Sequence, residues 1–348
     1  MRFGFTTGIC AAAAAKASAI FITLGKIPEN VCIKNLDGQE FVLKVEHEDG
    51  NFFSIVKDSG DDVSDVTNGI KIFAAVEILE SFNEIFFERG EGVGIVTLPG
   101  LKIPVGEPAI NPVPRKMIEN AVREIIPKNS IKITIKIPCG KEIAKRTFNP
   151  RLGIVGGLSI LGTSGFVKPM NEKALLDSLS LELNMIRALD FRELYVTFAG
   201  SGEKALRKLF NVTGRNVIQS ANYIGYVIDE ALKLDFNRIK ICGHPGKLLK
   251  VAAGSFNTHS KIADGRLEAL CTHLALAWAG REFINKIFNS NTTNEAIELI
   301  DKANFNYVWD NIAGIIAKKC CERTFYKIKF DVFIIDNDTK ILGSFKNE

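Results

Sequence analysis

The sequence is poor in the residues that build metal sites and disulfide frameworks. Only four histidines occur among its 348 residues, and its seven cysteines form no Cys-x-x-Cys pair. A structural zinc site usually needs such a pair or two closely spaced histidines. An odd number of scattered cysteines also argues against disulfides. We therefore expect reduced thiols and no metal site built by the protein itself.

The chain also lacks a large excess of charge of one sign. Its 44 basic and 40 acidic residues give a net charge of +4, whereas proteins that bind nucleic acid or membrane surfaces carry basic patches. The N-terminus shows no apolar stretch behind a basic start, and the run "AAAAAKASAIF" is interrupted by Lys16 and Ser18. We expect this run to be too short to span a bilayer. The sequence thus predicts a cytoplasmic protein that binds neither nucleic acid nor membranes.

The sequence does contain enough apolar residues for a large core, at 46% of the chain, and its length is typical of two domains. The first part alternates short strand-like runs with Gly and Pro turns, and "SIKITIKIP" has the period of a strand. Helices are expected over residues 11–24 and 69–79 and in "PRKMIENAVREII". We interpret residues 1–189 as an α+β domain.

Beyond residue 190 the pattern changes to strands, glycine turns and helices in alternation, as in "ELYVTFAGSGEKALRKLF" and "RIKICGHPGKLLKVAAG". Such alternation predicts a three-layer α/β domain with a largely parallel sheet, here over residues 190–348. Ligands of these folds bind at the carboxyl ends of the strands, where the glycine turns lie. Gly200 and Gly202 in the first turn, and Gly243 and Gly246 in the second, are therefore candidate ligand-binding residues.

An unusual helical pattern opens the chain, in "GFTTGICAAAAAKA". Thr6 and Thr7 are suitable helix N-caps, and Gly8 permits a tight entry into the helix. The free N–H groups and positive dipole end of this helix suit a ligand carboxylate or phosphate, and its alanines allow close approach. The alternative is a helix that crosses a sheet at short range.

Clustered aspartates follow in "VKDSGDDVSDVTNG". Their spacing does not match an EF-hand loop, but clustered carboxylates can act as acid and base or bind a hard cation. Asp58 and Asp61 are the candidates for acid–base catalysis. The alternative is a solvated turn that caps the following helix.

Two further loops carry candidate ligand-binding residues. The Pro- and Gly-rich segment "GVGIVTLPGLKIPVGEPAINPVPRKM" holds Glu107 and Asn111 in a rigid loop. The segment "GKEIAKRTFNPRLGIVGGLSILGTSGFVKPM" joins a basic cluster to a Gly-rich turn, a combination that suits a polyanionic small molecule. Its candidates are Lys141, Arg146, Arg151, Thr163 and Ser164. The alternative is a solvated basic face beside an ordinary turn.

Three of the four histidines gather in and just after the segment "GHPGKLLKVAAGSFNTHSKIADGR". His244 and Lys247 flank a strand-to-helix glycine turn and His259 follows, so His244 and His259 are candidate acids or bases. The turn is not a P-loop, because Leu248 stands where Ser or Thr would follow the lysine. A phosphate-transferring enzyme is an alternative, as is a structural role for each histidine.

The sequence resembles the CbiD family of anaerobic cobalamin biosynthesis through five motifs in the family's order, which are "GFTTGICAAAAAKA", "KDSGDD", "VGEPAINPVPRKMI", "FNPRLGIVGGLSILGTSGFVKPM" and "GHPGKLLKVAAGSFNTHSKIADGR". The resemblance covers nearly the whole chain. It implies methylation at C1 of a cobalt-bearing corrin precursor by S-adenosylmethionine, with cobalt only in the substrate. It also implies a first domain like ribosomal S5 domain 2. Asn68, where histidine is expected, and "FAGSGE" depart from the family's pattern.

The chemistry of the candidate residues suggests their roles in such a reaction, although no catalytic residue is carried over from the family. Lys141, Arg146 and Arg151, with the helix N-terminus after Thr7, would bind the carboxylates of the corrinoid substrate. The four glycines would bind S-adenosylmethionine, and His244, His259, Asp58 or Asp61 would act as acid or base. The other substrate-binding candidates are Thr6, Gly8, Glu107, Asn111, Thr163, Ser164 and Lys247. A non-catalytic tetrapyrrole-binding scaffold of the same pathway is the alternative function, and a homo-oligomer is compatible with the sequence.

Overall fold

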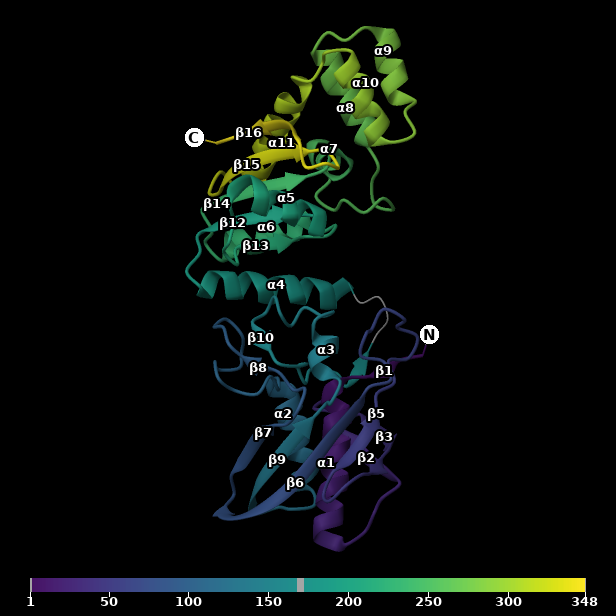
Figure 1. The fold of residues 1–348 in the computed structure, drawn as a ribbon, viewed down its shortest axis with the longest axis vertical. Coiled ribbons are helices and arrows are strands. Elements are labelled where there is room, and N and C mark those ends of the chain that lie inside the picture. Colours follow the sequence, from purple (N-terminus) through teal and green to yellow (C-terminus); the bar gives the residue numbers. More distant parts are fainter. Residues whose placement is uncertain (1, 168–171, 348) are drawn as a thin grey trace. The chain divides into compact units, whose positions relative to one another are not determined.

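The structure, a computed structural model, describes residues 2–167 and 172–347 (Figure 1). The chain divides into two compact units, Met1–Ala174 and Leu175–Glu348. The division therefore falls in the first turn of helix α4 (Glu172–Ala188), whereas we expected a domain boundary at residue 190. The reason is that α4 bonds to the second unit, because Ser180 Oγ lies 2.6 Å from Tyr226 Oη and Arg187 Nε donates to Leu234 O at 3.0 Å.

The first unit is built on a five-stranded sheet of order β4-β5-β6-β9-β7. Its strands are β4 (Glu46–His47), β5 (Phe53–Val56), β6 (Lys71–Phe82), β7 (Ile85–Arg89) and β9 (Asn129–Lys136). The pairs are antiparallel except β7 with β9, which is parallel. The predicted strand "SIKITIKIP" is confirmed as β9.

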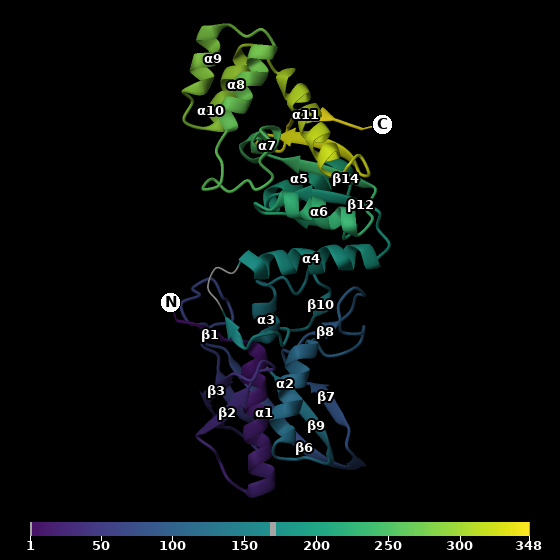
Figure 2. The same cartoon turned by 180° about the vertical axis from the view of Figure 1, so that it is seen from behind.

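Helices α1 (Thr7–Leu24) and α2 (Pro112–Arg123) lie side by side on the same face of this sheet (Figures 1 and 2). The alanines of α1 are fully buried at residues 11–15, 17 and 19. A helix that is apolar all round is buried all round, and small side chains let the sheet and α2 approach its backbone closely. The alternative interpretation of the opening motif, a close crossing of a sheet, therefore describes α1.

The prediction of a helix over residues 69–79 was wrong, because most of this stretch belongs to the long strand β6. Ile72, Ala74 and Val76 alternate with less buried residues and face the core. The run of Ala, Glu and Ile favours a helix by composition, but pairing with β5 and β9 on both edges overrides that local preference.

The remaining elements of the first unit form short pairs around the main sheet. Two of the expected strand-like runs are confirmed as β2 and β3, which pair antiparallel. β1 also pairs with β11, and β8 with β10. These elements are β1 (Gly4–Phe5), β2 (Asn30–Lys34), β3 (Glu40–Lys44), β8 (Ile95–Val96), α3 (Gly140–Ala144), β10 (Ile154–Val155) and β11 (Phe166–Val167).

The second unit confirms an α/β fold with a largely parallel sheet, of order β13-β12-β14-β15-β16. Four neighbouring strands are parallel and β16 closes one edge antiparallel. The strands are β12 (Glu193–Thr197), β13 (Val217–Gln219), β14 (Arg238–Gly243), β15 (Lys329–Ile335) and β16 (Ile341–Phe345). Sequence reasoning missed β13, because its three residues shortly precede helix α6 and continue the apolar pattern of that helix.

Helices flank this sheet on both faces. α5 packs on the face that presents Tyr195, Val217 and Phe333, whereas α7 and α11 contact β15. Alternate residues of a strand face opposite sides, so both faces of β12, β14 and β15 are buried, as in a three-layer fold. The helices are α5 (Gly200–Phe210), α6 (Ile224–Lys233), α7 (Pro245–Ala252), α8 (Arg266–Leu276), α9 (Arg281–Phe288), α10 (Thr293–Lys302) and α11 (Val308–Arg323).

Helix α1 is long and apolar enough to cross a membrane, with 18 residues. The expectation that this segment is too short to span a bilayer was therefore wrong on length, because the helix starts at Thr7 and continues to Leu24. In the fold, however, 67% of the helix is buried inside the protein, which is the behaviour of a core helix.

Candidate functional site

The second unit has a topological switch point at the carboxyl ends of its strands. β12 pairs with β13 on one side and with β14 on the other. The chain leaves β12 through α5 toward β13, and leaves β14 through α7 toward β15, so the two turns diverge. The space between such diverging turns is where open α/β sheets bind ligands.

A cavity of about 390 Å³ lies at this point. Its walls come from the ends of β12, β14 and β15, the turn after β13, and the first turns of α5 and α7. The polar residues that line it include Thr197, Ser201, Asn222, His244 and Lys247. The cavity therefore joins both predicted glycine turns into one site.

The predicted glycines divide into two groups. Gly202 and Gly243 line the cavity, whereas Gly200 and Gly246 lie in the first turns of α5 and α7 without lining it. A Cβ on Gly202 would meet Thr197 Oγ1 at 1.8 Å, and one on Gly243 would meet the Phe198 ring at 2.7 Å. Both positions exclude side chains because the strand ends and helix starts are packed against each other.

His244 has both ring nitrogens engaged within the chain. It is the N-cap of α7, where Nδ1 accepts from Gly246 N at 3.1 Å and Nε2 lies 2.8 Å from Asn294 Oδ1. Because the amide oxygen is an acceptor, Nε2 carries the proton. Burial lowers the pKa of His244, and the bond to Asn294 opposes this only in part. His244 is therefore a neutral, fixed side chain that holds the start of α7 against α10.

Lys247 supplies a cation to the same wall. Its Nζ contacts Asn222 Oδ1, and burial, followed by the nearby Lys250 and Arg266, lowers the pKa of Lys247. The backbone carbonyl of Asn222 also accepts a hydrogen bond from Thr258 N at 2.9 Å. His259 comes next in the chain but does not line the cavity, and its Nδ1 accepts from Lys261 N at 3.1 Å. The structure thus brings Lys247 to the cavity, whereas His259 is not among the residues that line it.

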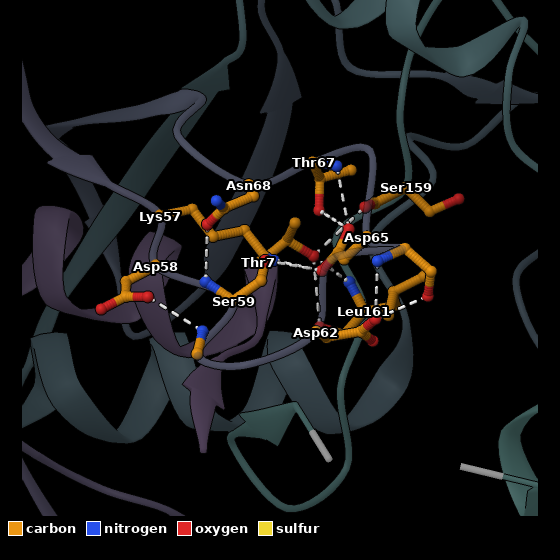
Figure 3. Close-up of polar contacts among 12 residues, drawn as sticks. Thr7, Lys57, Asp58, Ser59, Asp62, Asp65, Thr67, Asn68, Ser159 and Leu161 are labelled. Atoms are coloured by element: carbon orange, nitrogen blue, oxygen red, sulfur yellow. Dashed lines mark hydrogen bonds and ion pairs between the residues drawn. The ribbon is translucent and has the colours of Figure 1, made fainter. Parts of the chain in front are cut away.

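In the first unit the aspartate loop surrounds a buried lysine (Figure 3). Lys57 is 2% exposed, and its Nζ lies 2.6 Å from both Ser59 Oγ and Asp65 Oδ2. Ser59 Oγ donates to the same carboxylate at 2.7 Å. Burial raises the pKa of Asp65, but the bonds from Lys57, Thr67 and Ser59 and the charge of Lys57 bring it down to about 2.

Sequence reasoning missed Lys57 as a member of this cluster, although a signal was present. Phe53 and Ile55 are buried in β5, and the alternation continues through residue 57. A lysine at an inward-facing strand position needs a buried partner, and Asp65 is that partner.

Asp58 and Asp61 hold the N-terminal segment. Arg2 donates to Asp58 through both Nη atoms, and Arg2 N donates to Asp61 Oδ2 at 2.7 Å. The bond from Arg2, followed by that from Gly60 N, lowers the pKa of Asp58. An aspartate that stays ionised is a poor general acid, so this geometry gives Asp58 the role of an ion-pair partner.

The Thr-Thr-Gly turn uses its polar groups inside the fold. Thr6 caps α1 by accepting from Ile9 N at 3.4 Å, and Thr7 Oγ1 accepts from Leu161 N at 2.8 Å. Gly8 N donates to Leu161 O at 2.9 Å. The three residues are buried, so this helix start is closed by residues 159–161 and does not present these groups to a ligand.

The other predicted residues of the first unit lie in separate places. Arg115 Nη2 donates to Glu107 at 3.1 Å, Asn111 begins α2, and Ser164 O accepts from Asn35 Nδ2 at 2.8 Å. The basic residues lie on α3 and the turns after it, where Lys141 and Arg146 are exposed and Arg151 is half-buried. Thr163 is exposed.

The side chains of His, Cys, Asp and Glu do not gather in groups of three or more suited to a metal ion anywhere in residues 2–167 or 172–347. The seven cysteines are free thiols, as expected.

Known proteins resemble this chain over its whole length. It matches the family model CbiD over residues 1–169 and the model "CbiD, C-terminal domain" over residues 257–345. It is 43% identical to a cobalt-precorrin-5B C(1)-methyltransferase of Alkaliphilus metalliredigens, over 99% of this chain and 92% of that one. A protein of the same name from Methanocaldococcus jannaschii is 40% identical over 99% of this chain and 96% of its own. The chain belongs to the CbiD family.

A crystal structure titled as the cobalamin biosynthesis protein CbiD of Archaeoglobus fulgidus is 33% identical to this chain. The structural match covers 76% of this chain and 84% of that chain, with a TM-score of 0.41.

Two loops that are expected from the sequence to depart from the family's pattern have local structural roles. Asn68 Oδ1 accepts from Ser59 N at 2.9 Å, so Asn68 braces the loop around Lys57. "FAGSGE" forms the turn after β12 and the start of α5, where Gly202 packs over Thr197.

Proposed function

We propose that this chain transfers a methyl group from S-adenosylmethionine to C1 of cobalt-precorrin-5B in cobalamin biosynthesis. The observation that supports this most is the identity of 43% and 40%, over 99% of the chain, to proteins named cobalt-precorrin-5B C(1)-methyltransferase. Methyl transfer forms a C1–CH₃ bond and breaks the S–CH₃ bond, and the sulfur keeps the electron pair. The protein contributes mainly by holding the two carbons in line at attack distance.

We place the methyl donor in the cavity of the second unit. Its volume of about 390 Å³ is within the range of pockets that enclose ligands of this size, and it is small for a whole corrin macrocycle. Gly202 and Gly243 form its floor, and the starts of α5 and α7 point amide donors toward it. Gly200 and Gly246 lie in the first turns of α5 and α7 beside it.

We place the carboxylates of the corrinoid on the basic segment of the first unit. Lys141 and Arg146 are exposed, and neither side chain has a hydrogen bond or ion pair with another residue in the described part of the chain. Arg151 follows in the next turn. The cobalt arrives in the substrate, and the free thiols suit a cytoplasmic reaction. The ribosomal S5 domain 2-like fold stays our proposal for the first unit.

Replacing both Lys141 and Arg146 by alanine should raise the KM for the corrinoid about tenfold, because two charge-assisted contacts are lost. The Kd for S-adenosylhomocysteine should not change. Lys145→Ala is the matched control, since Lys145 is already paired with Glu142 at 2.6 Å. Equal loss of both affinities would contradict the assignment of the two ligands to different units.

Of the predicted acids and bases, we retain His259 as the group that moves a proton. Its Nδ1 is occupied by Lys261 N, whereas its Nε2 has no hydrogen-bond partner within residues 2–167 and 172–347. His259→Gln should lower kcat at saturating substrates by about 100-fold, a typical contribution of a general acid or base. An unchanged kcat would remove His259 from the chemistry.

The overall function is tested by incubating the protein with cobalt-precorrin-5B and S-adenosylmethionine that carries an isotopic label in its methyl group. We expect a labelled product of one added methyl and one S-adenosylhomocysteine per turnover. Calorimetry with S-adenosylmethionine distinguishes the methyltransferase from the alternative function, because a non-catalytic scaffold would bind the corrinoid but not the methyl donor.

A further inference from the structure

A buried hydroxyl at the cavity has no partner. Thr197 is fully buried at the end of β12, and its Oγ1 makes no hydrogen bond with any residue in 2–167 or 172–347. Burying a hydroxyl without a partner is unfavourable. The backbone carbonyl of Thr197, in contrast, has partners: it accepts hydrogen bonds from Ser220 N at 2.7 Å and from Ser220 Oγ at 3.1 Å. The hydroxyl therefore stands out as a buried group at the cavity lining whose hydrogen-bonding capacity the described residues leave unused.

The same hydroxyl lies against the start of α5, which has no side-chain cap. The N-cap of α5 is Ala199, whose methyl group cannot accept a hydrogen bond. Gly200 and Ser201 are exposed, and the first-turn N–H groups of a helix need acceptors from outside the helix. Gly202 passes directly over Thr197 Oγ1, so these N–H groups and the hydroxyl lie at one end of the cavity.

The helix dipoles favour an anion at the start of α5. The dipoles of α5 and α7 both present their positive ends to the cavity, whereas the charged side chains in its wall, Lys247 and Asp336, are of opposite sign. His244 already caps α7 through Gly246 N, whereas α5 has no such acceptor. A carboxylate would supply acceptors to both the α5 N–H groups and the Thr197 hydroxyl.

We propose that Thr197 and the first turn of α5 bind the amino-acid carboxylate of the methyl donor, an orientation that rests on the proposed function of this cavity. Thr197 Oγ1 donates to the carboxylate from below, and the N–H groups at the start of α5 donate from the side. Gly202 is required here because any side chain would occupy the place of the hydroxyl.

The test compares two ligands on two variants by calorimetry. S-adenosylhomocysteine carries the amino-acid carboxylate, and 5′-methylthioadenosine lacks it. Thr197→Val removes the hydroxyl at nearly constant volume and should weaken S-adenosylhomocysteine binding about 10- to 100-fold. Binding of 5′-methylthioadenosine should not change. Thr197→Ser keeps the hydroxyl and should retain most of the affinity.

Thermal unfolding of the ligand-free protein supplies a second readout. Thr197→Val should have an equal or higher Tm, because it removes a buried polar group that has no partner. Thr324→Val is the matched control, since Thr324 is also fully buried but bonds to Cys320 O at 3.2 Å. This control should lower the Tm and leave the affinity for S-adenosylhomocysteine unchanged.

Each outcome decides the question. If the wild type binds S-adenosylhomocysteine and Thr197→Val binds it equally well, the carboxylate lies elsewhere and this inference is wrong. An equal loss of affinity for both ligands in Thr197→Val would also overturn it, because the hydroxyl would then not bind the carboxylate specifically. If the wild type binds neither ligand, the proposed donor site fails, and the orientation fails with it.

Discussion

Ser201→Trp is expected to abolish binding of S-adenosylhomocysteine while the protein stays folded. Ser201 is exposed in the first turn of α5 and lines the cavity of about 390 Å³. An indole at this position takes the space of the ligand without displacing core residues. We expect the Kd to rise by more than about 100-fold, which corresponds to roughly 3 kcal/mol. Calorimetry measures the affinity, and the thermal unfolding midpoint reports on the fold.

Lys204→Trp is the control for this variant. Lys204 is exposed on the same helix but does not line the cavity, so the same indole should leave the affinity unchanged. If Ser201→Trp binds S-adenosylhomocysteine as tightly as the wild type, the donor does not occupy this cavity.

Asp65→Ala should destabilise the first unit by about 3–5 kcal/mol, because it leaves the buried ammonium of Lys57 without its counter-ion. The free energy of unfolding from urea titration measures this. The double variant Lys57→Met with Asp65→Leu should lose less, since it buries no unpaired charge. Glu142→Ala removes an exposed ion pair with Lys145 and should change the stability little. A loss as small in Asp65→Ala as in Glu142→Ala would contradict a buried role for this pair.

The same carboxylate predicts how stability depends on pH. The pKa of Asp65 is about 2 in the folded protein, below its value of about 3.9 in an unfolded chain. The stabilisation is therefore complete above about pH 4 and is lost as the pH falls toward about 2. Asp65→Asn should remove this part of the acid dependence in urea titrations between these pH values.

The sequence predicted the elements whose signals are local. The alternation in β9, the proline at the start of α2 and the strand, turn and helix repeats of the second unit all led to elements that exist. β6 was mistaken for a helix because its composition favours one, and only its pairing with β5 and β9 decides otherwise. The division in the first turn of α4 depends in the same way on the bonds of this helix to α6.

The site was predictable to a similar extent. The rule that ligands bind where strands end identified four glycines, of which Gly202 and Gly243 line the cavity and Gly200 and Gly246 do not. His244 and Lys247, singled out in the second of these turns, also line it. That His244 has no free ring nitrogen depends on Asn294, which is distant in the sequence. Whether a buried hydroxyl such as that of Thr197 has a partner depends on every atom packed around it. No local pattern carries that information.

The alanine helix α1 limits how this chain can vary in evolution. Residues 11–15 are fully buried, and the helix packs against both the sheet and α2, so larger side chains would overpack a close-packed core and cost stability. Glycine would weaken the helix, and serine would bury a hydroxyl. These positions therefore require a side chain that is both small and apolar, which makes a run of one residue type one of the most restricted segments of the chain.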